Sequence, residues 1–376
     1  MRTAIVGCGF VADFYMQSLP LYPVLELAAV TDRDPVRLAQ FAGFHGLTCA
    51  RDSLDGVLSD PSIELVLNLT NPDSHYEVSK ACLLAGKHVY SEKPLAMRME
   101  EATELLALAQ SRGLQIASAP CNVLGETAQT VWKALRERRI GDIKLVYAEL
   151  DDGMVFHMPY RKWFSASGRQ WPYKDEFEVG CTLEHAGYYV TWMTAFFGPA
   201  ASVTAFASCL YPDKLTDVPL DRDAPDLSVA CIQFESGVVC RLTCTIIAQE
   251  DHRLRMFGDR GILSVEDCWN YHSPVVIKRM FNIRRRTIIE PIGRRYPLVR
   301  IQGTRQSARG SNKMQFCRGP AEMASAVQER RQSRLPADFC LHNNEIVLAI
   351  QNATENGSTH RLRTSFKAAP QPMLIL

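Results

Sequence analysis

The stretch Gly7-Cys8-Gly9-Phe10-Val11-Ala12 decides the fold of this chain. It follows an apolar run of strand type at residues 3–6 and precedes a segment with helical spacing. Gly7 allows a tight turn after the strand, Gly9 lets backbone approach a pyrophosphate, and the small Ala12 permits close packing of helix on strand. A glycine-rich turn between a strand and a helix predicts a dinucleotide-binding α/β domain.

An acid stands where the ribose of such a dinucleotide is expected. Asp32 follows the second apolar run, residues 25–31, twenty positions after Ala12. Its carboxylate would accept hydrogen bonds from the ribose hydroxyls and repel a 2′-phosphate, which favours NAD over NADP. The neighbouring Arg33 keeps NADP open, because a guanidinium pairs well with a phosphate. Phe10 and Val11 open the helix whose first N–H groups would face the phosphates.

Strand-type and helical segments alternate through residues 1–122. The expected strands are 3–6, 25–31, 65–69, 89–90 and 114–117, and the expected helices are 10–19, 35–44, 74–85 and 99–111. This alternation predicts an α/β fold, a Rossmann domain with a doubly wound parallel sheet.

From residue 123 to residue 376 the pattern is mostly extended. The runs lie at 143–150, 202–208, 228–235, 238–247 and 262–265, with helices expected at 126–138, 183–197, 323–331 and 341–356. We therefore expect a second, α+β domain for substrate binding and oligomerisation, with a large, mostly antiparallel, open sheet.

The composition limits the class of protein. The 376 residues are 47% hydrophobic and 22% charged with a formal net charge of +1, which is typical of a globular protein and argues against nucleic acid as a partner. No apolar run reaches the ~18 residues of a membrane span, and the N-terminus lacks signal-peptide features. The twelve cysteines include no C-x-x-C pair, so we expect no metal site and reduced thiols in the cytoplasm.

A second motif, Glu92-Lys93-Pro94, follows the apolar run that ends at Tyr90. With the glycine stretch, with Asn71-Pro72 and His75, and with the run from residue 85 to residue 95, it makes the chain resemble the Gfo/Idh/MocA oxidoreductases. That family includes glucose–fructose oxidoreductase and inositol dehydrogenase. The resemblance continues through residues 180–198, 258–261 and 356–357, and so spans nearly the whole chain.

The resemblance implies an NAD(P)-dependent oxidoreductase in which Lys93 contacts the reacting hydroxyl and the nicotinamide. It implies a cis Lys93–Pro94 bond, and a cofactor cleft lined by Glu92, Asn71, Pro72 and His75. By family analogy, a homodimer or homotetramer forms through the C-terminal sheet. The alternative for Lys93 is a solvated lysine in a loop.

The segment near residue 184 departs from the family pattern. Glu184 stands where Asp is common and Tyr188 where histidine is usual, and two residues four apart share one face of a helix. We favour Lys93 as the polarising group, Tyr188 as proton relay and Glu184 as orienting group. His185 is an alternative base, because a phenol with a pKa of about 10 is a weak base at neutral pH. Purely structural roles for Tyr188 and His185 stay open.

Two further stretches bear on the substrate. Residues 151–180 are rich in aromatic side chains, and His157, Tyr160 and Trp163 are candidates to bind a sugar ring; the alternative is packing beneath a long loop. Residues 278–318 hold twelve Lys or Arg and one acid, Glu290, which indicates either a solvated edge or subunit contact, or attraction of an anionic substrate.

The sequence thus favours a dehydrogenase acting on a secondary hydroxyl of a sugar, above all a nucleotide-linked sugar. Three alternatives stay open: a dehydrogenase of free sugars or cyclitols, a glycosidase that uses NAD transiently, and a non-catalytic dinucleotide sensor.

Overall fold

The structure is a computed structural model that describes residues 1–301 and 314–367. Its contacts divide the chain into two units. The first comprises Met1–Cys121, Pro159–Val179 and Gln315–Asn344, and the second comprises Asn122–Met158, Gly180–Met314 and Glu345–Leu376. The expected division after residue 122 treats all later residues as one domain, whereas two later segments return to the first unit.

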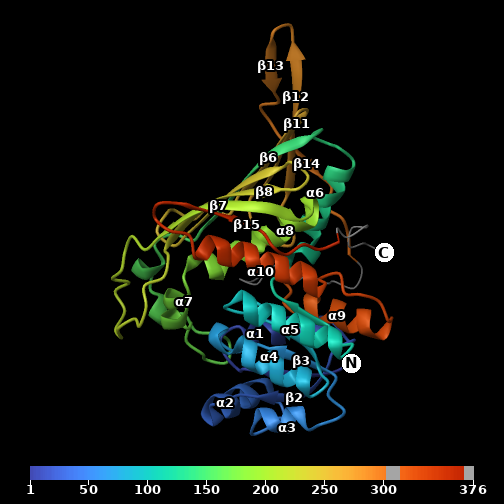
Figure 1. The fold of residues 1–376 in the computed structure, drawn as a ribbon, viewed down its shortest axis with the longest axis vertical. Helices are drawn as coiled ribbons and strands as arrows, with labels where there is room; N and C mark the ends of the chain where they lie inside the picture. The colour runs from blue at the N-terminus through green and yellow to red at the C-terminus, as the bar shows by residue number, and fades with distance from the viewer. Residues whose placement is uncertain (302–313, 368–376) are drawn as a thin grey trace. The chain divides into compact units, whose positions relative to one another are not determined.

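A five-stranded parallel sheet with the order β2-β1-β3-β4-β5 forms the first unit. Its strands are β1 (Arg2–Val6), β2 (Glu26–Thr31), β3 (Leu65–Asn68), β4 (His88–Ser91) and β5 (Ile116–Ser118) (Figure 1). The connecting helices are α1 (Ala12–Ser18), α2 (Pro35–His45), α3 (Leu54–Leu58), α4 (His75–Leu84) and α5 (Met99–Ser111). The strand order reverses between β1 and β3, which makes the sheet doubly wound and confirms the expected fold class.

Helix α9 (Arg318–Gln328) returns from the far end of the chain to pack on β4. A Cβ atom at Gly319 would lie 2.3 Å from the hydroxyl oxygen of Tyr90, so only a residue without a side chain permits this close approach. The sequence predicts this helix as part of the second domain. Its helical spacing shows that one face is buried but does not show against which sheet.

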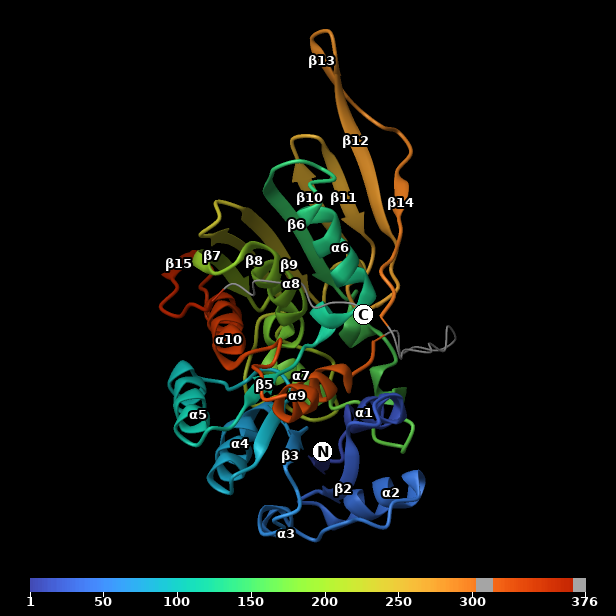
Figure 2. The ribbon, with the colours of Figure 1, turned by 90° about the vertical axis from the view of Figure 1, so that its right-hand side faces the viewer.

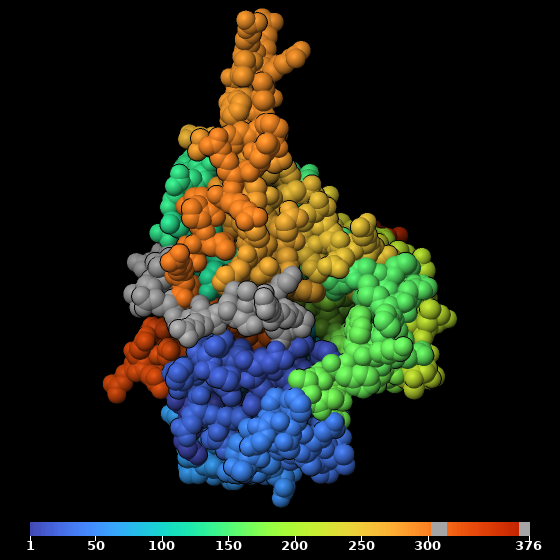
Figure 3. Space-filling model, turned by 180° about the vertical axis from the view of Figure 1, so that it is seen from behind, coloured from blue at the N-terminus to red at the C-terminus, as the bar shows by residue number. Residues whose placement is uncertain are grey.

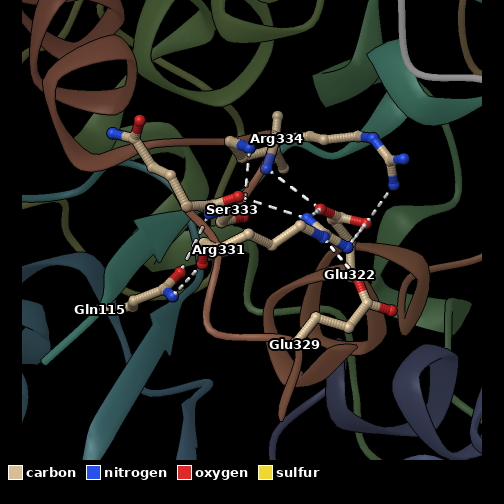
Figure 4. A network of polar contacts seen from close by, with 8 residues as sticks. Gln115, Glu322, Glu329, Arg331, Ser333 and Arg334 are labelled. Carbon is tan, nitrogen blue, oxygen red and sulfur yellow. Dashed lines mark hydrogen bonds and ion pairs between the residues drawn. The ribbon is translucent and has the colours of Figure 1, made fainter. Parts of the chain in front are cut away.

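A carboxylate whose side chain is only 9% exposed holds the segment after α9. Glu322 accepts hydrogen bonds from the guanidinium of Arg331 and from both the guanidinium and the backbone N–H of Arg334, the latter two at 2.7 and 3.1 Å (Figure 4). The side-chain amide of Gln115, just before β5, donates to the carbonyl oxygen of Arg331 at 2.9 Å. Glu329 lies 2.6 Å from Arg331 but is exposed. These contacts connect the C-terminal segment to the parallel sheet.

The second unit is built on a ten-stranded sheet. Nine strands follow the order β13-β12-β11-β10-β6-β9-β8-β7-β15, and the tenth, β14, pairs with β12. The strands β6 and β9 run parallel and the other neighbours antiparallel, which confirms the expectation of a mostly antiparallel sheet. The strands are β6 (Ile143–Asp151), β7 (Ala200–Ser208), β8 (Leu227–Phe234), β9 (Val239–Thr245), β10 (Leu254–Gly258), β11 (Gly261–Val265), β12 (Val275–Ile283), β13 (Arg286–Ile289), β14 (Arg294–Tyr296) and β15 (Ser358–Arg361).

Helices α6 (Glu126–Arg136) and α8 (Gly187–Phe197) belong to the same unit (Figure 2). Trp132 of α6 contacts Phe196 of α8 at 5.8 Å between ring centroids, and Phe197 contacts Phe234 of β8 at 5.7 Å. Along β8 buried and more exposed residues alternate, so one face of the sheet carries the core. The last long helix, α10, spans Ala337–Gln351.

The basic stretch 278–318 forms β12, β13 and β14 in its first part. These strands are not predicted from the sequence, because their polar and basic residues hide the alternation that marks a half-buried strand. Arg305, Arg309 and Lys313 of this stretch lie outside the described residues. Within residues 1–301 and 314–367, no helix has both the length and the apolar character needed to cross a bilayer.

We expect Glu322→Ala to lower the free energy of unfolding by about 1–3 kcal/mol, because it leaves two guanidinium groups and an N–H without their acceptor. Glu329→Ala is the matched control. It removes an exposed partner of the same arginine and should change the free energy by less than about 0.5 kcal/mol. Urea denaturation followed by circular dichroism measures both, and equal losses would contradict the role given to Glu322.

Candidate functional site

The glycine turn after β1 passes very close to the end of β3. Gly7 has a φ of +99°, and a Cβ atom there would lie 2.6 Å from the carbonyl oxygen of Leu69. At Gly9 a Cβ atom would meet no atom within 4 Å. Ala12 is fully buried at the start of α1, which begins two residues later than expected. The turn therefore forbids a side chain at its first glycine and has room at its second.

Asp32 connects this turn to the end of β2. One carboxylate oxygen accepts the backbone N–H of Cys8 at 2.8 Å, and the other accepts the N–H of Asp34 at 2.9 Å. Burial and the charge of Asp32 raise the pKa of the Cys8 thiol to about 12, so the thiol stays protonated at neutral pH. Arg33 is exposed, and Arg37 lies 3.5 Å from Asp32. Arg37 was not among the residues expected at the cofactor, although it stands in the first turn of the helix after Asp32.

The buried Glu92 and the neighbouring Lys93 directly follow the end of strand β4. Glu92 is 6% exposed and accepts hydrogen bonds from the hydroxyl of Tyr15 at 2.7 Å and from the backbone N–H of Lys93 at 3.1 Å. Burial and the Glu92 charge hold the pKa of Tyr15 well above its usual range, so the phenol keeps its proton. The Lys93–Pro94 bond is cis, as the resemblance implies. The turn that carries Lys93 is thus fixed to α1.

The segment after β3 contains the other three residues expected at the cofactor. Asn71 is exposed and donates from its side chain to Asp175 at 2.6 Å, and Pro72 opens a short 3-10 turn. His75 is fully buried, with ring nitrogens 2.7 and 2.9 Å from the carbonyl oxygens of Pro94 and Thr70. The imidazole of His75 therefore connects the segments that follow β3 and β4.

Residues 159–179 are held on the first unit by a carboxylate that the sequence analysis did not single out as a site residue. One oxygen of Asp13 accepts the backbone N–H and the hydroxyl of Ser167 at 2.9 and 2.8 Å, and the other lies 2.6 Å from His45. Burial alone would raise the pKa of Asp13, but hydrogen bonds with Ser165, Ser167 and His45 lower it. An anionic Asp13 thus fixes this segment beside the glycine turn.

The aromatic stretch 151–180 divides between the two units. In the second unit His157 is exposed. In the first unit Tyr160 is buried and its ring lies 5.4 Å from that of Phe177 in α7 (Tyr173–Val179), and Trp163 is half-buried with its ring 5.2 Å from that of Trp171. Several of these aromatic rings therefore pack on one another.

In the second unit the carboxylate of Asp152 bridges two histidines. Its oxygens lie 2.8 Å from Nε2 of His185 and 2.6 Å from Nε2 of His252. Burial alone would raise the pKa of Asp152, but the two histidines lower it. Burial likewise opposes the charge of His252, whose pKa is nevertheless raised by its hydrogen bond with Asp152. An anionic carboxylate therefore stands between two imidazoles.

The second ring nitrogen of His185, Nδ1, is buried and has no hydrogen-bond partner among the described residues. Because Nε2 faces a carboxylate, the neutral ring carries its proton there and keeps the lone pair on Nδ1. The indole of Trp269 lies against the rings of His185 and Tyr188, at 5.8 and 5.5 Å, and against His252 at 4.4 Å. The structure thus brings His185 and Tyr188 to the same indole.

Glu184 is buried near the start of the same segment. The turn Thr182–Ala186 is π-helical and α8 begins only at Gly187, so the helix expected from residue 183 starts four residues later. A π-helical turn is wider than an α-helical one and changes which residues share a face. Asp152, His252 and Trp269 were missed as site residues, because they lie on other strands and loops, far from His185 in sequence.

Asp151, beside Asp152, is an unusual carboxyl. Its Oδ1 is buried without a hydrogen-bond partner among the described residues, and burial together with the charges of Glu149, Asp251 and Asp152 raises its pKa to about 7. The folded state therefore prefers the protonated acid. Below the ordinary carboxyl pKa of about 4 the acid is protonated in both the folded and the unfolded state, so its burial does not change the free energy of unfolding. As the pH rises towards 7 the unfolded acid ionises while the folded acid resists ionisation, which lowers the free energy of unfolding.

In the described part of the chain no group of three or more His, Cys, Asp or Glu is placed to hold a metal ion.

We expect Asp151→Asn to raise the melting temperature by a few degrees at pH 8, where the wild-type carboxyl would have to ionise in a buried place. At pH 4.5 the gain should be several times smaller, since folded Asp151 is then protonated at little cost. Thermal unfolding followed by circular dichroism at both pH values tests this. An equal gain at both would show that the amide acts through packing instead of charge.

Two sequence models of one family match the chain. The oxidoreductase family with an NAD-binding Rossmann fold, GFO/IDH/MocA, matches residues 1–119, and the GFO/IDH/MocA C-terminal domain matches residues 128–264. Among curated proteins, the trans-1,2-dihydrobenzene-1,2-diol dehydrogenase of Bos taurus is 26% identical over 275 residues, which are 72% of this chain and 76% of the relative.

Solved structures share the fold over nearly the full chain. An oxidoreductase from Agrobacterium radiobacter in complex with NAD+, L-tartaric acid and magnesium has a TM-score of 0.74 at 14% identity and covers 96% of this chain and 98% of its own. The WlbA dehydrogenase from Bordetella pertussis in complex with NADH and UDP-GlcNAcA has a TM-score of 0.71 at 16% identity and covers 97% and 98%. With the glycine turn held by Asp32 and the cis Lys93–Pro94 turn after β4, these matches show that the chain belongs to the GFO/IDH/MocA family of NAD(P)-dependent oxidoreductases.

Proposed function

We propose that this oxidoreductase moves a hydride between the nicotinamide and a secondary carbinol carbon of a sugar ring, with a nucleotide-linked sugar as the first candidate substrate. Oxidation of an alcohol needs a group that takes the hydroxyl proton. The observation that carries the proposal is the imidazole of His185, whose Nε2 lies 2.8 Å from Asp152 while its buried Nδ1 has no hydrogen-bond partner among the described residues.

The residues of the first unit fit a dinucleotide. A backbone turn with room at Gly9 would admit the pyrophosphate, and Asp32, whose oxygens each accept one backbone N–H, retains acceptor capacity for ribose hydroxyls. Bound NAD supplies the hydride acceptor. Asp32 favours NAD, while Arg33 and Arg37 beside it are the residues that would pair with a 2′-phosphate.

The roles of the remaining residues follow from their chemistry. Lys93 polarises the reacting hydroxyl with its ammonium group, and His185 accepts the proton on Nδ1. Asp152 and His252 position the ring of His185. Tyr188 donates a hydrogen bond and relays the proton, a role that suits a phenol better than that of base at neutral pH. Glu184 orients the substrate.

The comparisons support two substrate classes that share vicinal hydroxyls on a six-membered ring. The WlbA dehydrogenase was crystallised with UDP-GlcNAcA, which is a nucleotide-linked sugar. The curated mammalian relative acts on a trans-dihydrodiol, which makes such carbocyclic diols the second candidate. Arg284, Arg285 and Arg286 do not enter this proposal, since the hairpin that carries them leaves the sheet at the end opposite to Asp152.

We expect Gly9→Ala to fold with an unchanged melting temperature, because its Cβ meets no neighbour, and to bind NAD at least tenfold more weakly, because the methyl group occupies the approach to the pyrophosphate. Titration calorimetry with NAD and with NADP measures the change and decides the cofactor. Gly7→Ala is the contrasting variant, since it strains a φ of +99° and should lower the melting temperature. Wild-type affinity in Gly9→Ala would place the pyrophosphate elsewhere.

We expect Lys93→Met and His185→Gln each to reduce kcat by about 10²–10⁴-fold, with NAD affinity unchanged in His185→Gln. Absorbance at 340 nm with nucleotide sugars, matched free sugars and cyclitols, and a trans-dihydrodiol identifies the substrate. Full activity in His185→Gln would leave Lys93 and Tyr188 as the groups that take the hydroxyl proton.

Two outcomes of the same assay point away from a sugar dehydrogenase. Reduction of NAD by the dihydrodiol alone would favour the second candidate. Release of free sugar from a glycoside without net formation of NADH would identify a glycosidase that uses NAD transiently.

A further inference from the structure

Most of the large apolar side chains exposed in the described residues lie in two segments of the second unit. The first segment, here called the arm, is the hairpin of residues 279–292, and the second, the acidic loop, is residues 209–226 between β7 and β8. The arm exposes Phe281, Ile283, Ile288, Ile289 and Ile292, and the loop exposes Leu210, Tyr211, Leu215 and Val218. Exposed large apolar side chains that gather in one segment are typical of an interaction site.

The arm extends beyond the sheet as an isolated ribbon. The pairing of β12 with β11 ends at Arg279 opposite Gly261, and from Met280 to Ile283 the strand pairs only with β13. Figures 1 and 2 show β12 and β13 projecting past β10 and β11, and Figure 3 shows the same hairpin in orange with no other described segment beside it. A two-stranded ribbon is at best marginally stable in water, so this one needs a covering surface.

The two segments carry opposite charge. The tip of the arm consists of Arg284, Arg285 and Arg286, and Glu290 is the one acid of residues 279–292. The acidic loop holds five aspartates against Lys214 and Arg222, and Lys214 is itself buried against Asp226 at 2.8 Å. Each segment therefore combines exposed apolar side chains with the charge that the other lacks, which is the pattern of complementary docking surfaces.

The arm and the loop cannot meet within one chain. Five strand spacings, about 24 Å, separate β12 from β8 in the sheet order. They also lie at opposite ends of the strands: the arm leaves where Gly258 pairs with Ile143, while the loop leaves β7 at Ser208, at the end where Asp151 pairs with Thr245. A contact between them requires two molecules.

We infer that the arm of one copy of this chain docks on the acidic loop of a second copy. Two-fold symmetry repeats the contact, because each copy then presents its arm to the loop of the other. Phe281, Ile283 and Ile288, with Phe281 paired opposite Ile288, supply the apolar part, and the arginines at the tip face the aspartates of the loop. An anionic membrane is a poorer partner, since it would attract the arm but repel the loop.

Sedimentation velocity of the full chain across micromolar concentrations tests the inference. Three variants are compared with the wild type: an apolar variant, Phe281→Ser with Ile288→Ser; an arm reversal, Arg284→Glu with Arg285→Glu; and a loop reversal, Asp213→Lys with Asp223→Lys. Val36→Ser is the control for loss of exposed apolar surface, because Val36 is 72% exposed on α2, outside both segments. Thermal unfolding establishes that each variant folds.

We expect the wild type and Val36→Ser to form dimers, and each arm or loop variant to dissociate with a dissociation constant raised at least tenfold. A mixture of the arm reversal with the loop reversal should recover a heterodimer, since each variant then carries the charge that the other needs. This recovery holds even if the apolar variant fails to fold. A monomeric wild type, dimers unaffected by the variants, or arm-dependent binding to phosphatidylserine vesicles without dimers would each overturn the inference.

Discussion

The hydrogen bond from the backbone N–H of Cys8 to the buried carboxylate of Asp32 determines how the first unit presents its ligand site. A charged carboxylate can be buried only where hydrogen-bond donors surround it, and here the donors are backbone N–H groups of the glycine turn and of the residues after β2. The same interaction therefore fixes the path of the turn and places a negative charge where the ribose is proposed to bind. Gly7 is part of this arrangement, because the turn lies against Leu69.

The same constraint recurs at three other carboxylates. Glu92 fixes the turn of Lys93 to Tyr15 of α1, Asp13 holds the segment 159–179 beside the glycine turn, and Asp152 aligns His185 and His252. In each case the anion is sheltered from water and its partners come from distant parts of the chain. The positions proposed for catalysis thus depend on buried carboxylates whose charge is stabilised by hydrogen bonds. Asp151, whose Oδ1 has no such partner among the described residues, has a raised pKa instead.

Within the second unit, the acidic loop leaves the sheet at the same end as Asp152, and only the arm lies at the opposite end. Asp152 and the segment of His185 lie at one end of the strands, whereas the arm of residues 279–292 leaves the other end. The basic cluster was open to two interpretations in the sequence, an anionic substrate or a subunit contact. Its place on an isolated ribbon far from His185 favours the contact.

Patterns that are local in sequence determined the Rossmann fold and the glycine turn with Asp32, because strand, turn and helix preferences act over a few residues. The resemblance to the family implied the cis turn at Lys93 and marked Glu184, His185 and Tyr188 as candidates. Only the tertiary structure decided that Asp152, His252 and Trp269 surround His185, that residues 159–179 and 315–344 return to the first unit, and that the arginines stand on a projecting hairpin. The physical reason is that the residue types along the chain show which segments must bury an apolar face or pair a charge. The long-range packing of the fold determines which residues become their partners.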